Sequence, residues 1–541
     1  MIKELFKILV IILKLIFLLS FVTAENNYHR CGFASTDSQY RISRPSLDTF
    51  VDDGFFRIHY DLNGKDAPEQ GYGEDIQLYE DTNGSGHPDY IDALGDAANY
   101  SYDVMVDLGY GPALLLIIED CNNSSDCQDR GGSPLYDIYV NDRYAISEGY
   151  TVTEYGVNNS DGNDDIIKGS SFIEIDNGMT ETSYFTNGLD AMRTTIAHEL
   201  FHAVQRSYRD YDPGSGHAYF YEMSSTWIED IVYPDINDYI NPGWTEKFFN
   251  HPHMLSNIQD TNGYSIGLYM HYLTKKIAEN DNQIIQDIWE KFEINNDPLA
   301  SINDVLKEKN TNFIKTWIDF CSFNFFNGLY PDDNNDFYFH PDQILFAQPI
   351  TIEDSDHDYP FTTNISSLID IDNTSIDIIS IRNVNPESDF NIDIQTNLEN
   401  LDTPLSSIIG NIVLLSPNNL DSQKVIDINE FSSEMYDGIE YIYFILGLDD
   451  YEINNNQFNN YLHKTESTEF DVSFCNESKG DIDLNCIINI LDYIILVENI
   501  VDSIDDNSID RSPFPLCDLN DDNECNTQDA ELLINLISET P

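Results

Sequence analysis

Short stretches in which apolar and polar residues alternate, separated by Gly, Asn and Asp, fill residues 26–188. A period of two is typical of β-strands, because successive side chains point to opposite faces of a sheet. The clearest predicted strands here are 55–60, 114–118 and 136–140. We therefore expect this part of the chain to be rich in β-sheet.

Between residues 190 and 327 the apolar residues recur instead every three or four positions. This spacing places them on one face of an α-helix. The predicted helices are 191–208, 218–232, 264–278 and 312–326. Together with the preceding strands they form an α+β domain, for which we expect the boundaries 25–335.

Short β-branched runs return between residues 346 and 472, and the clearest are 376–381 and 441–446. Frequent turns between short strands are typical of a β-sandwich, so we assign 340–473 to an all-β, sandwich-like domain. The remaining residues, 474–541, contain two similar segments about 37 positions apart, which indicates an internal duplication.

Residues 1–24 have the form of a secretory signal peptide, with Lys3 and Lys7 before an apolar stretch and Ala24 at the end. The alternative is a membrane anchor, but this stretch contains Lys14 and is shorter than the roughly 20 apolar residues that span a bilayer. We expect cleavage after Ala24 and no transmembrane segment afterwards. The mature protein is then secreted, extracellular or associated with the cell surface.

The charge balance excludes one class of binding partner. The 541 residues contain 96 Asp plus Glu against 26 Lys plus Arg, a formal net charge of -70. Nucleic-acid binding needs a basic surface, so we exclude it. Apolar residues still make up 41% and aromatic residues 12%, which excludes a disordered acidic chain. The acidic surface suits a salty, calcium-containing exterior, where ions screen self-repulsion.

The eight cysteines fit an oxidising compartment. Cys121 and Cys127 are predicted to form a disulfide that closes a small loop, while the pairing of the other six stays open. None has the CxxC spacing of a zinc ribbon, which disfavours zinc bound by cysteine.

Residues 198–202 read His-Glu-Leu-Phe-His within the predicted helix 191–208. Residues four apart lie one above the other on a helix, so His198 and His202 can share one zinc ion. Glu199 can then hold a water bound to that zinc. The histidines are not needed to bury the helix, because a separate apolar stripe is formed by Ile196, Leu200 and Val204.

The predicted helix 218–232 carries Glu222 and Glu229 on a side away from its apolar stripe. An acidic residue on such a face is usually only solvated, and the pattern alone leaves this alternative open.

The spacing of His198, Glu199, His202 and Glu222 resembles the gluzincin clan of zinc peptidases, to which thermolysin belongs. Glu222 follows His202 by twenty positions, the thermolysin spacing. The resemblance implies a zincin-like fold and a zinc ion held by His198, His202 and Glu222. It also implies that Glu199 is catalytic and takes the proton of a zinc-bound water as a peptide bond is hydrolysed.

The sequence departs from two related zinc-peptidase patterns, and these departures limit which class it can resemble. Gln205 and Tyr208 stand where the metzincin motif HExxHxxGxxH requires Gly and the third His, so that class is excluded. Thr226 stands where thermolysin-like enzymes have an acidic residue that supports a ligand, and Glu229 is our candidate to support a histidine ligand instead.

A wider similarity covers roughly residues 44–327 and relates the chain to a group of uncharacterised secreted bacterial metalloproteases. It is carried by residues 45–50, 56–60, 86–90 and 221–230. A Tyr or His usually stabilises the oxyanion in such chemistry, and Tyr264 is our candidate. The alternatives, which the sequence does not separate, are His217, His251, His253 and His271.

The duplicated tail has two twelve-residue loops with oxygen-bearing side chains at positions 1, 3, 5, 9 and 12, the layout that binds calcium. Their residues are Asp481, Asp483, Asn485, Asn489 and Asp492 in the first, and Asp518, Asn520, Asp522, Asn526 and Asp529 in the second. The predicted helices 493–500 and 530–537 follow them. Position 6, normally Gly, is Cys486 in the first loop and Asn523 in the second, so the first site is the weaker one.

Over residues 480–538 the tail resembles a dockerin, which implies calcium-dependent docking to a cohesin-type partner. A third loop repeats the calcium spacing, with Asp81, Asn83, Ser85, Asp89 and Asp92 as candidate ligands. The alternative for every such loop is an ordinary Asp- and Asn-rich surface loop.

Two functions follow from these observations. The first is a secreted zinc endopeptidase with a small, helical, dockerin-like calcium-binding domain at its C-terminus. The alternative is a non-catalytic surface or adhesion protein built on a peptidase scaffold. Glu199 favours the enzyme, because a scaffold could lose this residue without losing a metal ligand.

Overall fold

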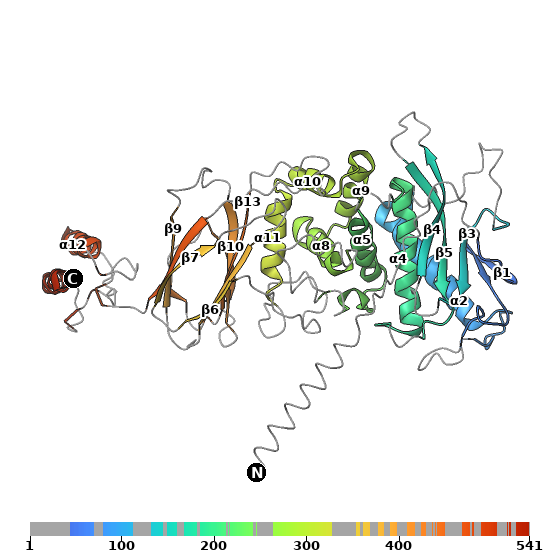
Figure 1. Ribbon diagram of the computed structural model, residues 1–541, viewed down its shortest axis with the longest axis horizontal. Coiled ribbons are helices and arrows are strands. Elements are labelled where there is room, and N and C mark those ends of the chain that lie inside the picture. Colours follow the sequence, from blue (N-terminus) through green and yellow to red (C-terminus); the bar gives the residue numbers. More distant parts are fainter. Residues whose placement is uncertain are drawn as a thin grey trace, which may run out of the picture. The chain divides into compact units, whose positions relative to one another are not determined.

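The computed structural model describes the parts of the chain that Figure 1 draws in colour, together with a few single residues. Up to residue 326 these are 44–69, 79–111, 131–143, 149–158, 167–180, 184–211, 215, 217–241, 245 and 263–326. Beyond it they are 353–357, 361–367, 377–383, 390–397, 408–416, 423–428, 435–436, 439, 441–448, 468–475, 479–480, 488, 490–505, 517, 519–520 and 526–539. The predicted signal peptide, strand 114–118 and disulfide Cys121–Cys127 lie outside these residues.

The chain divides into two compact units. The first comprises residues 1–210 and 228–238, and the second comprises 211–227 and 239–541. Helix α5 (Ala218–Val232) belongs to both, because it begins in the second unit and ends in the first.

The first unit contains a five-stranded mixed sheet in the order β1-β2-β3-β5-β4. Its strands are β1 (Thr49–Asp53), β2 (Phe56–Tyr60), β3 (Tyr136–Asn141), β4 (Gly149–Asn158) and β5 (Ile167–Asp176). Strands β2, β3 and β5 run parallel, whereas β1 and β4 are antiparallel to their neighbours. The predicted strands 55–60 and 136–140 thus correspond to β2 and β3.

Two helices pack on this sheet: α4 (Gly188–Tyr208) contacts β4 and β5, and α2 (Asp89–Met105) contacts β2 and α4. Helix α4 is buried on almost all sides, including several polar residues. Helix α2 was not predicted from the sequence, where only strands and turns were expected before residue 188. Its buried positions recur at helical spacing: Tyr90, Ile91, Leu94, Ala98, Ser101 and Met105.

In the second unit the described helices include α8 (Gly267–Tyr272), α9 (Gln283–Asn295), α10 (Pro298–Glu308) and α11 (Phe313–Phe323). Asp297 and Asn312 cap α10 and α11, accepting hydrogen bonds from N–H groups in the first turn at 3.0 and 2.9 Å. The predicted helix 264–278 is in fact three pieces: the 3₁₀ turn η4 (Tyr264–Ile266), α8, and the π-helical η5 (Leu273–Ile277).

Two further sheets follow in the chain, ordered β11-β10-β13-β8-β6 and β12-β9-β14-β7. The first contains β6 (Glu353–His357), β8 (Asp377–Asn383), β10 (Ile408–Leu415), β11 (Lys424–Asp427) and β13 (Tyr441–Leu448). The second contains β7 (Phe361–Ser367), β9 (Phe390–Asn397), β12 (Met435–Tyr436) and β14 (Thr468–Cys475). Strands β8 and β13 lie where 376–381 and 441–446 predicted them, while the sandwich-like domain itself stays a prediction.

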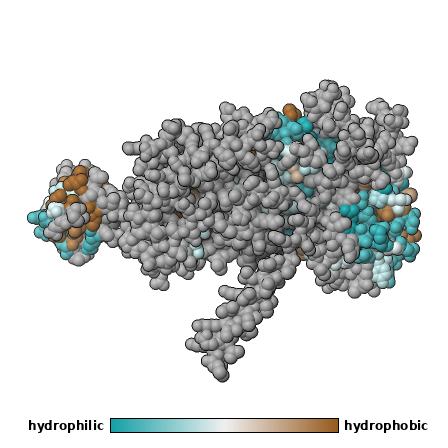
Figure 2. Space-filling view, in the orientation of Figure 1, coloured by the Kyte–Doolittle hydropathy of each residue, from teal (hydrophilic) through white to brown (hydrophobic). Residues whose placement is uncertain are grey.

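The tail has two helices, α12 (Ile490–Asp505) and α13 (Thr527–Glu539), which pack together around Leu496, Cys517, Ala530 and Leu533. Cys517 is disulfide-bonded, whereas Cys321 on α11 is a buried free thiol. Figure 2 shows apolar surface on the tail helices, where the exposed large apolar residues are Ile490, Ile494, Leu532 and Leu536. Among the described helices, none combines the length and apolar content that a membrane span requires.

One glycine fixes the segment beside the start of α5. Gly263 has φ of 99°, and a Cβ atom there would lie 2.0 Å from the carbonyl oxygen of Tyr219. Four residues later, a Cβ atom on Gly267 would lie 2.9 Å from Cγ2 of Thr226. The segment from Gly263 to Gly267 therefore runs along α5, past the turn that carries Glu222.

We expect Gly263→Ala to destabilise the protein by at least about 2 kcal/mol, because it combines an unfavourable positive φ with a backbone clash. Gly64→Ala is the matched control: Gly64 also has positive φ, at 105°, but a Cβ atom added there would have no neighbour within 4 Å. Thermal unfolding should show a much lower midpoint for the first variant than for the second. Equal midpoints would show that the close approach to Tyr219 is unimportant.

Candidate metal centre

Helix α4 places the His-Glu-Leu-Phe-His sequence in the interior of the protein. His198, Glu199 and His202 are each only 1% exposed to solvent. The two imidazole rings lie at adjacent turns, with centroids 4.6 Å apart and planes at 84°. The helix therefore brings both histidines to one buried position, as their spacing predicts.

Helix α5 supplies a third side chain, Glu222, which is fully buried. One potential ligand atom from each of His198, His202 and Glu222 lies within 4.8 Å of the other two. Within the described part of the chain, this is the one group of three or more His, Cys, Asp or Glu side chains so arranged. The predicted ligand residues are thus brought together.

The donor set fits zinc. Zinc binds imidazole nitrogen and carboxylate oxygen at about 2.0–2.2 Å, and two histidines with one glutamate leave a fourth position for water or substrate. Calcium and magnesium prefer sets made of oxygen atoms, which two imidazoles do not provide. The residues present therefore match a catalytic zinc site better than a site for a hard cation.

Each histidine is oriented by a hydrogen bond through its other nitrogen. Nδ1 of His198 lies 2.6 Å from Oε1 of Glu229, and Nδ1 of His202 lies 2.7 Å from Oε1 of Gln205. With Nδ1 engaged in both rings, Nε2 is the nitrogen that can bind a metal. Such partners fix the tautomer and the ring orientation of a metal-binding histidine.

Glu229 thus occupies the supporting position that was predicted for it, and it is fully buried. Thr226, at the position where related enzymes have an acidic residue, donates instead to the carbonyl oxygen of Glu222 at 2.8 Å. In the sequence, Gln205 was notable only as a departure from the metzincin pattern. Its position three residues after His202, on the same helix face, is the signal that could have identified it.

The start of β4 lies close to Glu199. A Cβ atom on Gly149 would lie 3.2 Å from Cγ of Glu199 and 2.9 Å from Cγ2 of Thr195. Glycine at this position therefore leaves room for the glutamate between the helix and the sheet. Among the described strands, β4 pairs only with β5, so its other edge has no partner strand among them.

Five residues were predicted as candidates for stabilising an oxyanion. Tyr264 is buried beside Gly263, next to the start of α5, and stays a candidate. The ring of His217 packs against Phe292 at 5.8 Å. His271 is buried. This burial chiefly, and also the charge of Lys275, lower the pKa of His271 to about 3, so its ring is neutral near pH 7. His251 and His253 lie outside the described residues.

The loop from Asp81 to Asp92 forms much of its structure from its own hydrogen bonds. The carboxylate of Asp81 accepts the N–H groups of Gly84, Ser85 and Gly86 at 2.7–3.1 Å. Oδ2 of Asp92 accepts hydrogen bonds from Asn83 and Ser85 at 3.0 and 2.6 Å. This loop is not among the groups of three clustered metal-binding side chains, and calcium binding there stays a prediction.

The tail loops are described only in part, at Asp492, Asn520, Asn526 and Asp529, and the other predicted ligands lie outside the described residues. Asp492 and Asp529, the last positions of the two loops, are both fully buried. The carboxylate of Asp529 accepts N–H groups of Leu519, Asn520 and Asn526 at 2.9, 3.3 and 2.9 Å. Asp529 therefore ties the second loop to the first turn of α13.

The contact between Glu229 and His198 makes a prediction about metal affinity. We expect Glu229→Ala to weaken zinc binding by about 10- to 100-fold, because the ring loses its orienting acceptor. Glu229→Gln keeps an acceptor oxygen and should weaken it less. Competition with a chromophoric chelator measures the affinity, and Glu290→Ala, an exposed change on α9, is the control. Unchanged affinity in Glu229→Ala would remove the supporting role.

Comparison with known proteins gives one partial match and no function. Residues 176–326 match a family of unknown function (DUF6055). No curated protein and no solved structure matches the sequence. The matched stretch contains α4 and α5, and therefore all three residues of the candidate metal centre and Glu199.

Proposed function

We propose that this protein is a secreted, zinc-dependent endopeptidase. The observation that carries the proposal is the buried group of His198, His202 and Glu222, with Glu199 adjacent to the first histidine on α4. Two imidazoles and one carboxylate are the donor set of a catalytic zinc site. The gluzincin spacing in the sequence supports the same conclusion.

A zinc ion at this centre supplies a polarised substrate carbonyl and a water whose pKa falls toward about 7. His198, His202 and Glu222 hold that ion, and Glu229 and Gln205 keep the two rings in the required orientation. Glu199 accepts the water proton on its carboxylate and passes it to the leaving amine. The buried position of Glu199 excludes bulk water from this transfer.

The sheet offers a place for a polypeptide substrate. An edge strand presents backbone N–H and C=O groups, and an extended peptide can pair with them as an added strand. Among the described strands, β4 is the edge strand beside Glu199, and Gly149 brings its backbone close to the glutamate. A peptide added to β4 in this way would place its backbone on the strand that approaches the candidate catalytic glutamate.

The competing function is a binding or adhesion protein that keeps the scaffold without catalysis. Such a protein needs the three ligands at most, and not the glutamate that follows His198. Here Glu199 is present, buried, and accommodated by a glycine on the neighbouring strand. These features support the catalytic function.

For the tail we propose calcium-dependent docking to a cohesin-type partner. Ile490 and Ile494 lie one turn apart on α12, as do Leu532 and Leu536 on α13, and all four are exposed. Exposed large apolar side chains that recur on two adjacent helices are typical of an interaction surface. The calcium-loop spacing before each helix supports the dependence on calcium.

The proposed reaction is tested by Glu199→Gln. We expect zinc to stay bound while hydrolysis of casein or of a peptide library falls about 100- to 10,000-fold, because the general base is lost. Glu290→Gln makes the same chemical change on the surface and should leave the rate unchanged. Metal analysis and a cleavage assay on both variants and the wild type measure the two properties separately.

Two results would contradict the enzyme. The wild-type protein could hold zinc and cleave no member of a broad peptide library, which would favour the binding protein. Alternatively, Glu199→Gln could cleave at the wild-type rate, which would assign any activity to another site.

The calcium proposal predicts that chelation speeds hydrogen exchange in α12 and α13, because the loops that precede them lose their bound ions. Asp529→Ala should speed exchange in α13 even with calcium present, since its carboxylate also ties the loop together. Glu531→Ala, an exposed neighbour on α13, is the control. Exchange that is insensitive to calcium would refute calcium binding by the tail.

A further inference from the structure

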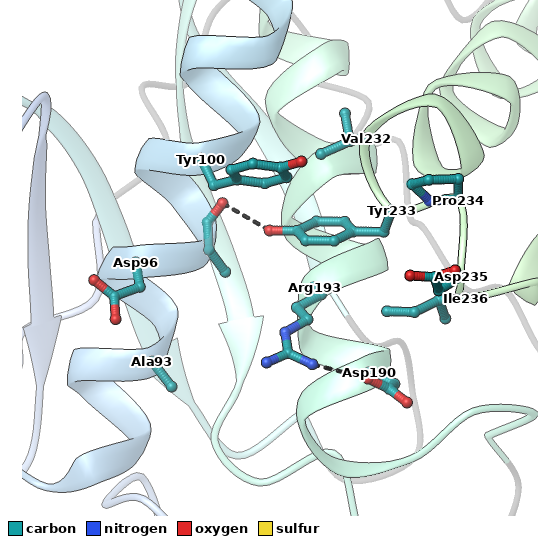
Figure 3. Close-up of a pocket in the computed structure, with 11 residues that line it drawn as sticks. Ala93, Asp96, Tyr100, Asp190, Arg193, Val232, Tyr233, Pro234, Asp235 and Ile236 are labelled. Carbon is teal, nitrogen blue, oxygen red and sulfur yellow. Dashed lines mark hydrogen bonds and ion pairs between the residues drawn. The ribbon is translucent and has the colours of Figure 1, made fainter.

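The first unit contains a cavity of about 620 Å³ that is separate from the four residues of the candidate metal centre. It is lined by one face of α2, by the first turns of α4, and by residues 232–236 at the end of α5 (Figure 3). Its volume lies within the range of small-ligand pockets, about 300–1,000 Å³. Nothing in the proposed reaction uses it.

Two tyrosines form part of the wall. Tyr233 is fixed, because its N–H bonds to the carbonyl oxygen of Glu229 at 2.8 Å and its hydroxyl donates to that of Ala97 at 3.1 Å. Burial raises the pKa of Tyr233 to about 12, so the hydroxyl stays protonated. The ring of Tyr100 lies 5.4 Å from that of Tyr233 and is 51% exposed, so it borders the opening to solvent (Figure 3).

The charged residues of the wall are mostly acidic. Asp96, Asp190 and Asp235 outnumber the single cation, Arg193. Arg193 pairs with Asp190 at 3.0 Å, whereas Asp96 and Asp235 make no ion pair with any described residue. The negative charges of Asp53 and Asp92 make the electrostatic potential around Asp96 more negative. Burial chiefly, and then the charges of Asp96 and Asp92, raise the pKa of Asp53.

We propose that this cavity binds lysine or arginine side chains of a polypeptide, with one cation facing Asp96, another facing Asp235 on the opposite side of the pocket, and a stem against Tyr100 (Figure 3). The two carboxylates are exposed and make no ion pair with any described residue, which favours cations, and an aromatic face adds attraction for them. The apolar stem of such a side chain covers Ile236, which also lines the wall.

Other ligands fit less well. An anion would meet an arginine that is already paired and a wall with a surplus of two negative charges. A bare metal ion needs clustered ligands, and these carboxylates are not among the described groups of three that lie within 4.8 Å. A free polyamine shares the cationic chemistry but lacks a peptide backbone, so the experiment has to separate the two.

The probe is a fluorescein-labelled peptide of four arginines, with its citrulline counterpart as the neutral control. Its binding to the full-length Glu199→Gln protein is followed by anisotropy at about 150 mM salt, where distant charges are screened. That background prevents cleavage of the probe, and the measurement needs neither zinc nor activity. Failure of this proposal is therefore distinguishable from failure of the peptidase.

We expect Asp96→Asn/Asp235→Asn to weaken binding of the arginine peptide about tenfold. Tyr100→Ala should weaken it about threefold, through loss of the ring face. The matched control is Asp103→Asn/Asp107→Asn, which removes two exposed charges on and just after α2, outside the cavity, and should change affinity less than about twofold. Thermal unfolding midpoints confirm that all variants fold.

Equal losses in the two double variants would show general attraction to an acidic surface and overturn the proposal. Unchanged binding in Asp96→Asn/Asp235→Asn would do the same. Spermidine that displaces the peptide at equal or lower concentration than an unlabelled arginine peptide would identify a free amine as the ligand and also overturn it. Weaker displacement by spermidine supports a peptide side chain.

Discussion

The hydrogen bond between Nδ1 of His198 and Oε1 of Glu229 joins the two helices that carry the candidate metal ligands. Both residues are almost completely buried, and removing one partner of a buried hydrogen bond is costly. Such a bond fixes the ring of His198 and the rotation of α5 about its axis at once. The geometry of the centre depends on it more than on any single apolar contact.

Helix α5 links this hydrogen bond to the third candidate ligand, because it carries both Glu229 and Glu222. Glu222 precedes Glu229 by seven residues, which is two turns and about 10 Å along the same helix face. Once Glu229 meets His198, Glu222 is held near the same side of α4, within reach of His202, one turn beyond His198.

The centre was predictable from sequence to the extent that its chemistry is local. His198 and His202 are spaced by one turn, and the bounds of α5 follow from an uninterrupted apolar pattern. Helix α2 was missed because its acidic first turn coincides with a calcium-loop spacing and Gly95 interrupts it. The order of strands in the five-stranded sheet and the acidic cavity depend on contacts between segments that are distant in sequence. The spacing of apolar residues along the chain does not predict such contacts.

Gly149 has a consequence for how the protein tolerates change. Its missing side chain is the space beside Glu199, so a methyl group there would press on Cγ of Glu199 and on Cγ2 of Thr195. It would also lie 3.2 Å from the carbonyl oxygen of Glu174 on β5, the strand that pairs with β4. Position 149 therefore couples the sheet to the proposed chemistry: any side chain there would crowd both the backbone of β5 and the glutamate that the proposed reaction requires.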